Sequence, residues 1–199
     1  MKSLNVKSTI VLAASILIAG EVLGQEQRPP QKLPFSIYGD HPDHFVPSGY
    51  MGDTSDIIVI GNYTKDPARG KACMKIKYGG KAAQGNKWAG VYWQDPANNW
   101  GTVKGGGYNL TGAKKLKFFA RGEKGGEMLE FKTGGVSGEY PDSFRAEAPI
   151  VSLTPEWQEY EIDLTDQDLT TVIGGFVFAV ARDKNPDGCV FYLDEVRFE

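Results

Sequence analysis

The chain has 199 residues, 41% of them hydrophobic, and a formal net charge of −3. This length is enough for one domain with a substantial core, and the mildly acidic balance argues against nucleic acid or anionic lipid as a partner. Glycine occurs 25 times at short intervals, as many tight turns between strands would require.

The first 24 residues have the pattern of a signal peptide. Lys2 and Lys7 precede the uncharged run TIVLAASILIAG, and Gly24 stands at a plausible cleavage point. The apolar run is shorter than the roughly 20 residues that a membrane-spanning helix needs, which disfavours the alternative of an uncleaved anchor. We therefore expect cleavage after Gly24 and a secreted or periplasmic protein.

Residues 25–44 begin with the polar, proline-rich segment QEQRPPQKLP and are predicted to form a tether. His41 and His44 lie in this segment, and a solvated stretch is favoured over a metal-binding loop because no further ligand cluster is close in the chain. The predicted domain then covers residues 45–199.

Nine short runs in this domain are rich in β-branched and aromatic residues, and each is bounded by Gly, Pro, Asn or Asp. In chain order they span residues 56–61, 72–78, 89–94, 115–122, 128–135, 148–153, 158–164, 174–181 and 189–198. Such a series predicts an all-β sandwich or barrel. The only helical candidate is a single turn in TDQDLTTV, residues 165–172.

The segment KWAGVYWQDPANNWG, residues 87–101, contains three of the four tryptophans. Val91 and Trp93 share one parity of the predicted strand, while Trp88 and Tyr92 share the other. At least one ring must therefore face away from the core. By the same alternation, residues 116, 118 and 120 of the run KLKFFARG face the core, and residues 117, 119 and 121 face outward.

A planar aromatic ring can stack on the C–H face of a sugar, while nearby polar side chains bind its hydroxyl groups. We therefore predict a ligand surface that combines exposed rings with such polar groups. Its residues are Tyr92, Trp100, Phe119, Tyr140, Arg121, Asp95, Asn99 and Asp142.

Three segments resemble the strand signatures of galactose-binding-like β-sandwich modules, the jelly-roll carbohydrate-binding modules of secreted glycan-degrading systems. They are YTKDPARGKACMKIKY, YNLTGAKKLKFFARG and the C-terminal WQEYEIDL…DLTTVIGGFVFAV…FYLDEVRFE. The resemblance covers roughly residues 45–199. It implies a two-sheet antiparallel jelly roll and a non-catalytic module that binds a poly- or oligosaccharide.

The resemblance also implies a structural calcium ion. Its ligands would be Asp194 and Asp66 with carbonyl oxygens near Gly70, and Asp53 or Asp56 could complete the shell. The alternative is that Asp194 caps a strand end or pairs with a lysine.

Several alternatives stay open at this point. A protein-interaction or envelope-assembly module on the same fold is the second hypothesis, because this fold also serves such roles. A glycosidase or lyase is third. A glycosidase would use two carboxylates across the sugar, such as Glu159 and Glu161, yet charged residues are ordinary on an exposed strand face. Cys73 and Cys189 form either a disulfide or two free thiols.

Overall fold

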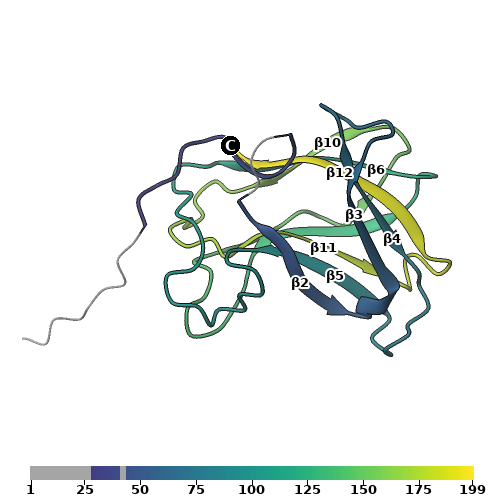
Figure 1. The fold of residues 1–199 in the computed structure, drawn as a ribbon, viewed down its shortest axis with the longest axis horizontal. Coiled ribbons are helices and arrows are strands. Elements are labelled where there is room, and N and C mark those ends of the chain that lie inside the picture. Colours follow the sequence, from purple (N-terminus) through teal and green to yellow (C-terminus); the bar gives the residue numbers. More distant parts are fainter. Residues whose placement is uncertain (1–27, 41–43) are drawn as a thin grey trace, which may run out of the picture.

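The computed structural model describes residues 28–40 and 44–199, which form two antiparallel sheets packed face to face (Figure 1). Sheet A has the order β10 (Gln158–Asp163), β6 (Lys115–Gly122), β12 (Cys189–Phe198), β4 (Cys73–Tyr78) and β3 (Ile57–Tyr63), and β1 (Phe35–Tyr38) also pairs with β12. Sheet B has the order β2 (Val46–Gly52), β5 (Trp88–Gln94), β11 (Gly174–Ala181), β7 (Met128–Gly134) and β8 (Arg145–Glu147), and β9 (Val151–Ser152) also pairs with β7. The predicted all-β fold, a two-sheet antiparallel sandwich, is confirmed.

All nine predicted runs contain a strand, but β1, β2 and β8 were not predicted. Strand β1 lies inside residues 25–44, the predicted tether, so the sandwich begins earlier than the sequence indicated. Its four residues are too few for a clear alternation, and Pro47 and Gly49 interrupt the pattern of β2. Residues 165–172 form no helix; the single short 3-10 helix of the described residues is η1 (Thr54–Asp56).

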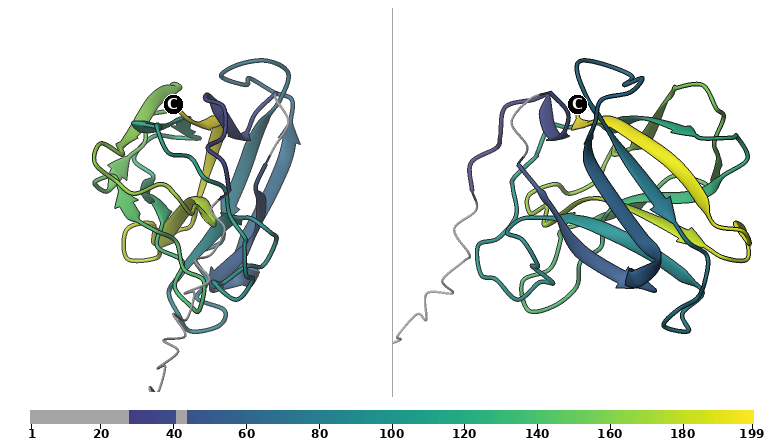
Figure 2. Two further views of the ribbon diagram at one scale, coloured as in Figure 1. Left: turned by 90° about the vertical axis from the view of Figure 1, so that its left-hand side faces the viewer. Right: turned by 45° about the vertical axis from the view of Figure 1, so that its right-hand side comes forward.

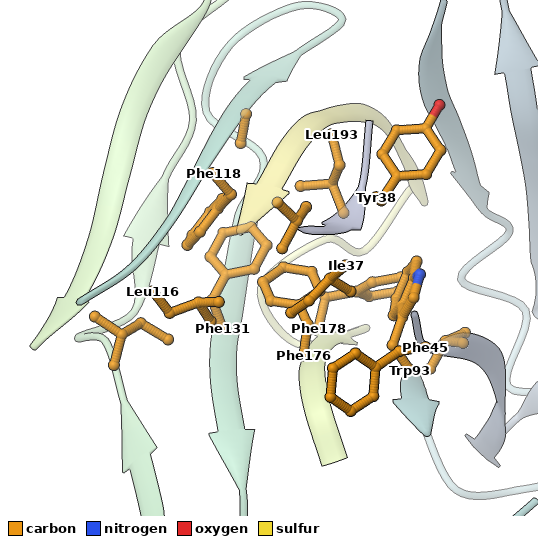
Figure 3. Packing of buried hydrophobic residues seen from close by; sticks show 14 of the residues in the cluster. Ile37, Tyr38, Phe45, Trp93, Leu116, Phe118, Phe131, Phe176, Phe178 and Leu193 are labelled. Carbon is orange, nitrogen blue, oxygen red and sulfur yellow. The ribbon is translucent and has the colours of Figure 1, made fainter. Parts of the chain in front are cut away.

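Aromatic rings from both sheets fill the space between the layers (Figure 3). Phe118 of β6 contacts Phe131 of β7 and Phe176 of β11, with ring centroids 4.6 and 5.2 Å away. Phe178 of β11 meets Phe191 of β12 at 5.1 Å. Because these contacts join sheet A to sheet B, they fix which face of every strand is internal.

The predicted parities are confirmed along β6 and β5. Phe118 is fully buried whereas its neighbour Phe119 is only partly buried, and Trp93 of β5 is 1% exposed. Strand β11 is apolar on both faces because it is the central strand of sheet B, between β5 and β7. The two views of Figure 2 show the sandwich from its edge and from an oblique angle.

Cys73 and Cys189 are both free, which decides the question that the sequence left open. Cys189 pairs with Tyr78, which lies five residues from Cys73 along β4. Five residues of strand span about 17 Å, far more than a disulfide can bridge. Burial raises the pKa of the Cys73 thiol to about 11 and that of Cys189 to about 12.

The predicted signal peptide lies outside the described residues. Within residues 28–40 and 44–199, no helix has the length and apolar character needed to cross a bilayer.

Phe118→Ala is expected to lower the free energy of unfolding by about 3–5 kcal/mol, because it leaves a cavity where the sheets meet. Phe119→Ala on the outer face is the matched control and is expected to stay within about 1 kcal/mol of wild type. Urea unfolding followed by fluorescence measures both. Equal losses for the two variants would contradict the assignment of the faces.

Candidate functional site

The described residues form a hollow over the outer face of each sheet, and these two hollows are similar in size. The hollow over sheet A has a volume of about 740 Å³ and the hollow over sheet B about 750 Å³. Tyr78 is the only aromatic residue that lines the former, and it is a buried residue whose strand parity places its side chain in the core. The hollow over sheet B includes the exposed ring of Trp88, so we take it as the candidate ligand site.

Small residues form the middle of the outer face of sheet B. Trp88, Gly90 and Tyr92 point outward from β5, because Val91 and Trp93 occupy the core. Gly90 lies between Met51 of β2 and Ala179 of β11, and Ala179 pairs with Glu130 of β7. The neighbouring row places Tyr92 beside Val177, followed by Lys132 and Glu147. The result is a floor formed by Gly90 and Ala179, with the Met51 methyl group packed 3.3 Å from where a Gly90 Cβ would lie and larger side chains around it.

Two exposed tryptophans stand at opposite ends of this face. Trp88 is 37% exposed at the start of β5, and Trp100 is 40% exposed in the loop that follows the strand. The Trp100 ring packs edge-on against Tyr92, with centroids 5.8 Å apart and planes at 82°. Tyr92 lies four residues beyond Trp88, which is about 13 Å along the strand. The face can therefore offer aromatic contacts at two well-separated points.

The loop that carries Trp100 is held by its own side chains and by a close backbone contact. The side-chain oxygen of Asn99 accepts N–H bonds from residues 101–103, at 3.0 to 3.2 Å. Gly101 has φ +75°, and a Cβ there would lie 2.2 Å from the carbonyl oxygen of Ser137. The Tyr140 N–H donates to the Gly101 carbonyl at 2.9 Å. These contacts fix where Trp100 can sit.

The predicted polar ligands Asp95, Asn99 and Asp142 bind backbone in this structure. Asp95 accepts the Gly107 N–H at 3.1 Å and lies 3.4 Å from the Arg28 guanidinium. Asn99 is fully buried. Each of these side chains thus stabilises a loop around the candidate site.

Asp142 joins the loop after β7 to the start of β11. Its carboxylate accepts N–H bonds from Val136 at 2.8 Å, from Gly174 at 3.2 Å and from Ile173. Burial raises the pKa of Asp142 to about 6 and outweighs these three N–H donors, which lower it.

Phe119 and Arg121 do not join Tyr92 and Trp100 on one surface. They point outward from β6 of sheet A, whereas Tyr92 points outward from β5 of sheet B. Since the outer faces of a two-layer sandwich look in opposite directions, a single predicted platform of all these rings is not formed. Alternation along each strand predicts that these residues face outward, but it does not predict the sheet to which each strand belongs.

On the outer face of sheet A, Phe119 and Arg121 contact other protein groups. The Arg69 guanidinium lies over the Phe119 ring at 5.1 Å, and the Arg121 guanidinium lies 3.9 Å from the Tyr192 ring centroid. Arg121 also pairs with Asp66 at 3.3 Å. Both side chains are therefore half-buried and already have partners within the protein.

Trp88 is missing from the residues predicted as ligands. The signal that identifies it is its shared parity with Tyr92, two strand repeats away. Lys87, the residue before Trp88, has φ +63°, which is not an extended conformation, so β5 begins abruptly at Trp88. The buried carboxylate of Asp53 fixes that start, because it accepts the Lys87 N–H at 2.6 Å and the Gln84 N–H at 2.8 Å.

The predicted calcium ligands are only partly brought together. Asp194 is fully buried and accepts the Arg69 N–H at 3.0 Å, so it meets the loop that contains Asp66 and Gly70. Asp53 lies beside the Tyr78 end of sheet A, five residues along β12 from Asp194, and cannot share an ion with it. In residues 28–40 and 44–199, no group of three or more His, Cys, Asp or Glu side chains is placed to hold a metal.

The carboxylates that invited a glycosidase hypothesis are engaged in the described structure. Glu159 pairs with Arg197 and Glu161 pairs with Lys115, each at 2.8 Å.

Comparison with known proteins supports the architecture. No protein-family model and no curated protein matches the sequence. A crystal structure of a family 30 carbohydrate-binding module is similar with a TM-score of 0.57 and 17% identity, over 84% of this chain and 99% of that chain. The family 30 carbohydrate-binding module of a cellulosomal cellulase from Clostridium thermocellum gives 0.52 and 16%, over 84% and 98%. The chain thus has the β-sandwich fold of carbohydrate-binding modules.

Asp142 is expected to make stability depend on pH. Its pKa is higher in the folded protein than the ordinary value of 3.8, so its stabilising contribution is full below pH 4 and is lost as the pH rises through about 6. The loss is at most about 3 kcal/mol. Asp142→Asn removes this titration and keeps the shape, so the melting temperatures of variant and wild type should diverge between pH 4 and 7. Parallel curves would contradict the raised pKa.

Proposed function

We propose that the protein is an exported, non-catalytic carbohydrate-binding module of the galactose-binding-like group, which binds a poly- or oligosaccharide on the outer face of sheet B. One observation carries the proposal: Trp88 and Trp100 expose their rings at the two ends of a face whose middle is formed by Gly90 and Ala179. The similarity to carbohydrate-binding modules in fold supports the same interpretation.

The geometry suits an extended sugar chain better than a compact ligand. The small residues leave room for sugar rings above the strands, and an exposed indole gains contact area when a sugar ring covers it. Lys132 and Glu130, which form an ion pair of 2.6 Å beside this floor, can exchange hydrogen bonds with hydroxyl groups. Asn99 and Asp142 hold the loops after β5 and β7, and these loops fix the end of the face where Trp100 lies.

A protein partner is the second candidate. Strand β2 is an edge of sheet B, and its residues Val46 and Tyr50 are 48% and 43% exposed. An exposed edge strand with apolar side chains can pair with another chain. Its ligand would contact the edge of the sandwich rather than the face between Trp88 and Trp100.

Trp88→Ala and Trp100→Ala are each expected to weaken polysaccharide binding by at least about tenfold, which is about 1.4 kcal/mol. Both rings are exposed, so melting should change little. Phe119→Ala is the matched control, because it removes a ring from the opposite sheet. Affinity gel electrophoresis against a panel of polysaccharides, with thermal melting of the same samples, measures these effects.

Two results would count against this site. If the tryptophan variants bind a retarding polysaccharide as wild type does, the ligand occupies another surface. If wild type is retarded by no polysaccharide while a Tyr50→Ala variant loses a protein partner, the second candidate replaces the first.

A structural calcium ion at Asp194 is part of the proposal. Asp194 is buried next to the acidic Glu195, burial raises its pKa, and no lysine or arginine side chain of the described residues pairs with it. Loop carbonyl oxygens near Gly70, together with Asp66 after a change of its side chain, would complete the ligands.

Calcium is expected to raise the melting temperature, because an ion that binds only the folded state adds about 1.4 kcal/mol for each tenfold excess over its dissociation constant. Asp194→Asn should abolish this response. Asp53→Asn is the control, since it removes a buried carboxylate at the other end of the sheet. A wild-type melting temperature that is the same in calcium and in EDTA would refute the site.

A further inference from the structure

We infer that the polysaccharide bound on sheet B carries carboxylate groups, so that its sugars include uronic acids, and that Lys87 and Arg182 bind these carboxylates. This inference rests on the proposed function and adds the chemical class of the ligand. It is carried by the charges around the hollow over sheet B.

Cations outnumber anions around this hollow. Its charged lining consists of Lys87, Lys132, Arg182, Lys184, Glu130 and Asp183. Two of the cations have acidic partners within the lining: Lys132 is 2.6 Å from Glu130, and Lys184 is 3.6 Å from Asp183. Among the described residues, Lys87 and Arg182 have no acidic side chain within ion-pair distance. Two positive charges are therefore left for a ligand.

These two cations stand at the Trp88 end of the hollow. Trp88 pairs with Ala181 in the β5–β11 ladder, so Lys87 and Arg182 are the next residues on the two strands. The Arg182 N–H donates to the Lys87 carbonyl at 2.9 Å, which keeps both backbones together. Both residues have the strand parity opposite to that of Trp88 and Ala181, but they line the same hollow as Trp88. Their long side chains can therefore extend to the substituents of a sugar ring stacked on Trp88.

The chemistry of these groups fits a carboxylate. A guanidinium can bind the two oxygens of a carboxylate with parallel hydrogen bonds, and a lysine ammonium adds a mobile charge. A neutral sugar would leave both charges without a counter-ion while it displaced water from them, which costs free energy. The positive end of this hollow is notable because the whole chain has a net charge of −3.

The hollow over sheet A provides an internal comparison. Its charged lining consists of Lys75, Lys77, Lys81, Lys124, Asp56, Glu123, Glu127 and Asp187. Four cations face four anions there, so an excess of positive charge distinguishes the tryptophan-bearing hollow from the other one.

The test compares uronic-acid polymers with their own neutral forms. Polygalacturonate, alginate and polyglucuronate are each used as such and after chemical reduction of their carboxyl groups, with a sulfated galactan as a further arm. Isothermal titration calorimetry with the full mature chain measures affinity at 20 and 200 mM salt. Wild type, Lys87→Gln, Arg182→Gln and the control Lys77→Gln are compared, the last removing an exposed lysine from the outer face of sheet A.

We expect at least one uronic-acid polymer to bind roughly tenfold or more tightly than its reduced form, with an affinity that falls as salt rises. Lys87→Gln and Arg182→Gln should each weaken that binding about tenfold without affecting the reduced form, and Lys77→Gln should have no effect. Their melting temperatures should stay close to that of wild type, because Lys87 and Arg182 are both exposed and lie outside the hydrophobic core.

Equal binding of acidic and reduced polymers, lost in Trp88→Ala, would overturn the carboxylate inference and leave the proposed function intact. Binding of the sulfated galactan alone would also overturn it, since the anion would then be a sulfate. If no polysaccharide binds in any arm, the proposed function itself fails.

Discussion

Side-chain alternation along β5, enforced by the aromatic core, is the constraint on which the candidate site depends. Val91 and Trp93 are buried against rings of β11, with the Trp93 and Phe176 centroids 5.5 Å apart. Because successive side chains of a strand point to opposite faces, the burial of these two residues places Trp88 and Tyr92 on the outer face. A shift of one residue would move the core residues to the candidate ligand surface and the surface residues into the core. The packing of the core therefore also fixes the geometry of the candidate site.

Buried polar side chains then set the ends of that strand. Asp53 binds the backbone of the turn before Trp88, and Asn99 binds the backbone of the turn that carries Trp100. Such groups are costly to bury without partners, and each is satisfied here by backbone N–H donors. Asp142 does the same for the neighbouring loop. Acidic and amide side chains near the site therefore hold its loops in place, and the proposed ligand contacts are made by the rings and cations that project beyond these loops.

The two faces of the sandwich use their charged and aromatic residues differently. On sheet A, Arg121 lies over Tyr192, and Lys75 donates to the Tyr192 hydroxyl at 2.9 Å, so cations and rings are partners of one another. On sheet B, the exposed tryptophans have no cation stacked on them in the described residues, and Lys87 and Arg182 have no acidic partner. Cations and aromatic rings therefore contact one another on the outer face of sheet A, whereas on the outer face of sheet B they have no such partners within the described residues.

The sequence by itself determined nine of the twelve strands of the described residues, the faces of β5 and β6, and the fold class. Alternation in KLKFFARG and AGVYWQ predicted which residues are buried, because a strand's period of two is a local property of the backbone. It also singled out the aromatic segment that contains Trp88, Tyr92 and Trp100. Only the tertiary structure decided which outward residues share a surface: strand order is set by pairing between distant segments, and it placed β6 with Phe119 in one sheet and β5 in the other. Likewise, only the folded chain shows that Asp142 binds backbone of residues 173 and 174, and that Lys87 lies beside Arg182, 95 residues further along the chain.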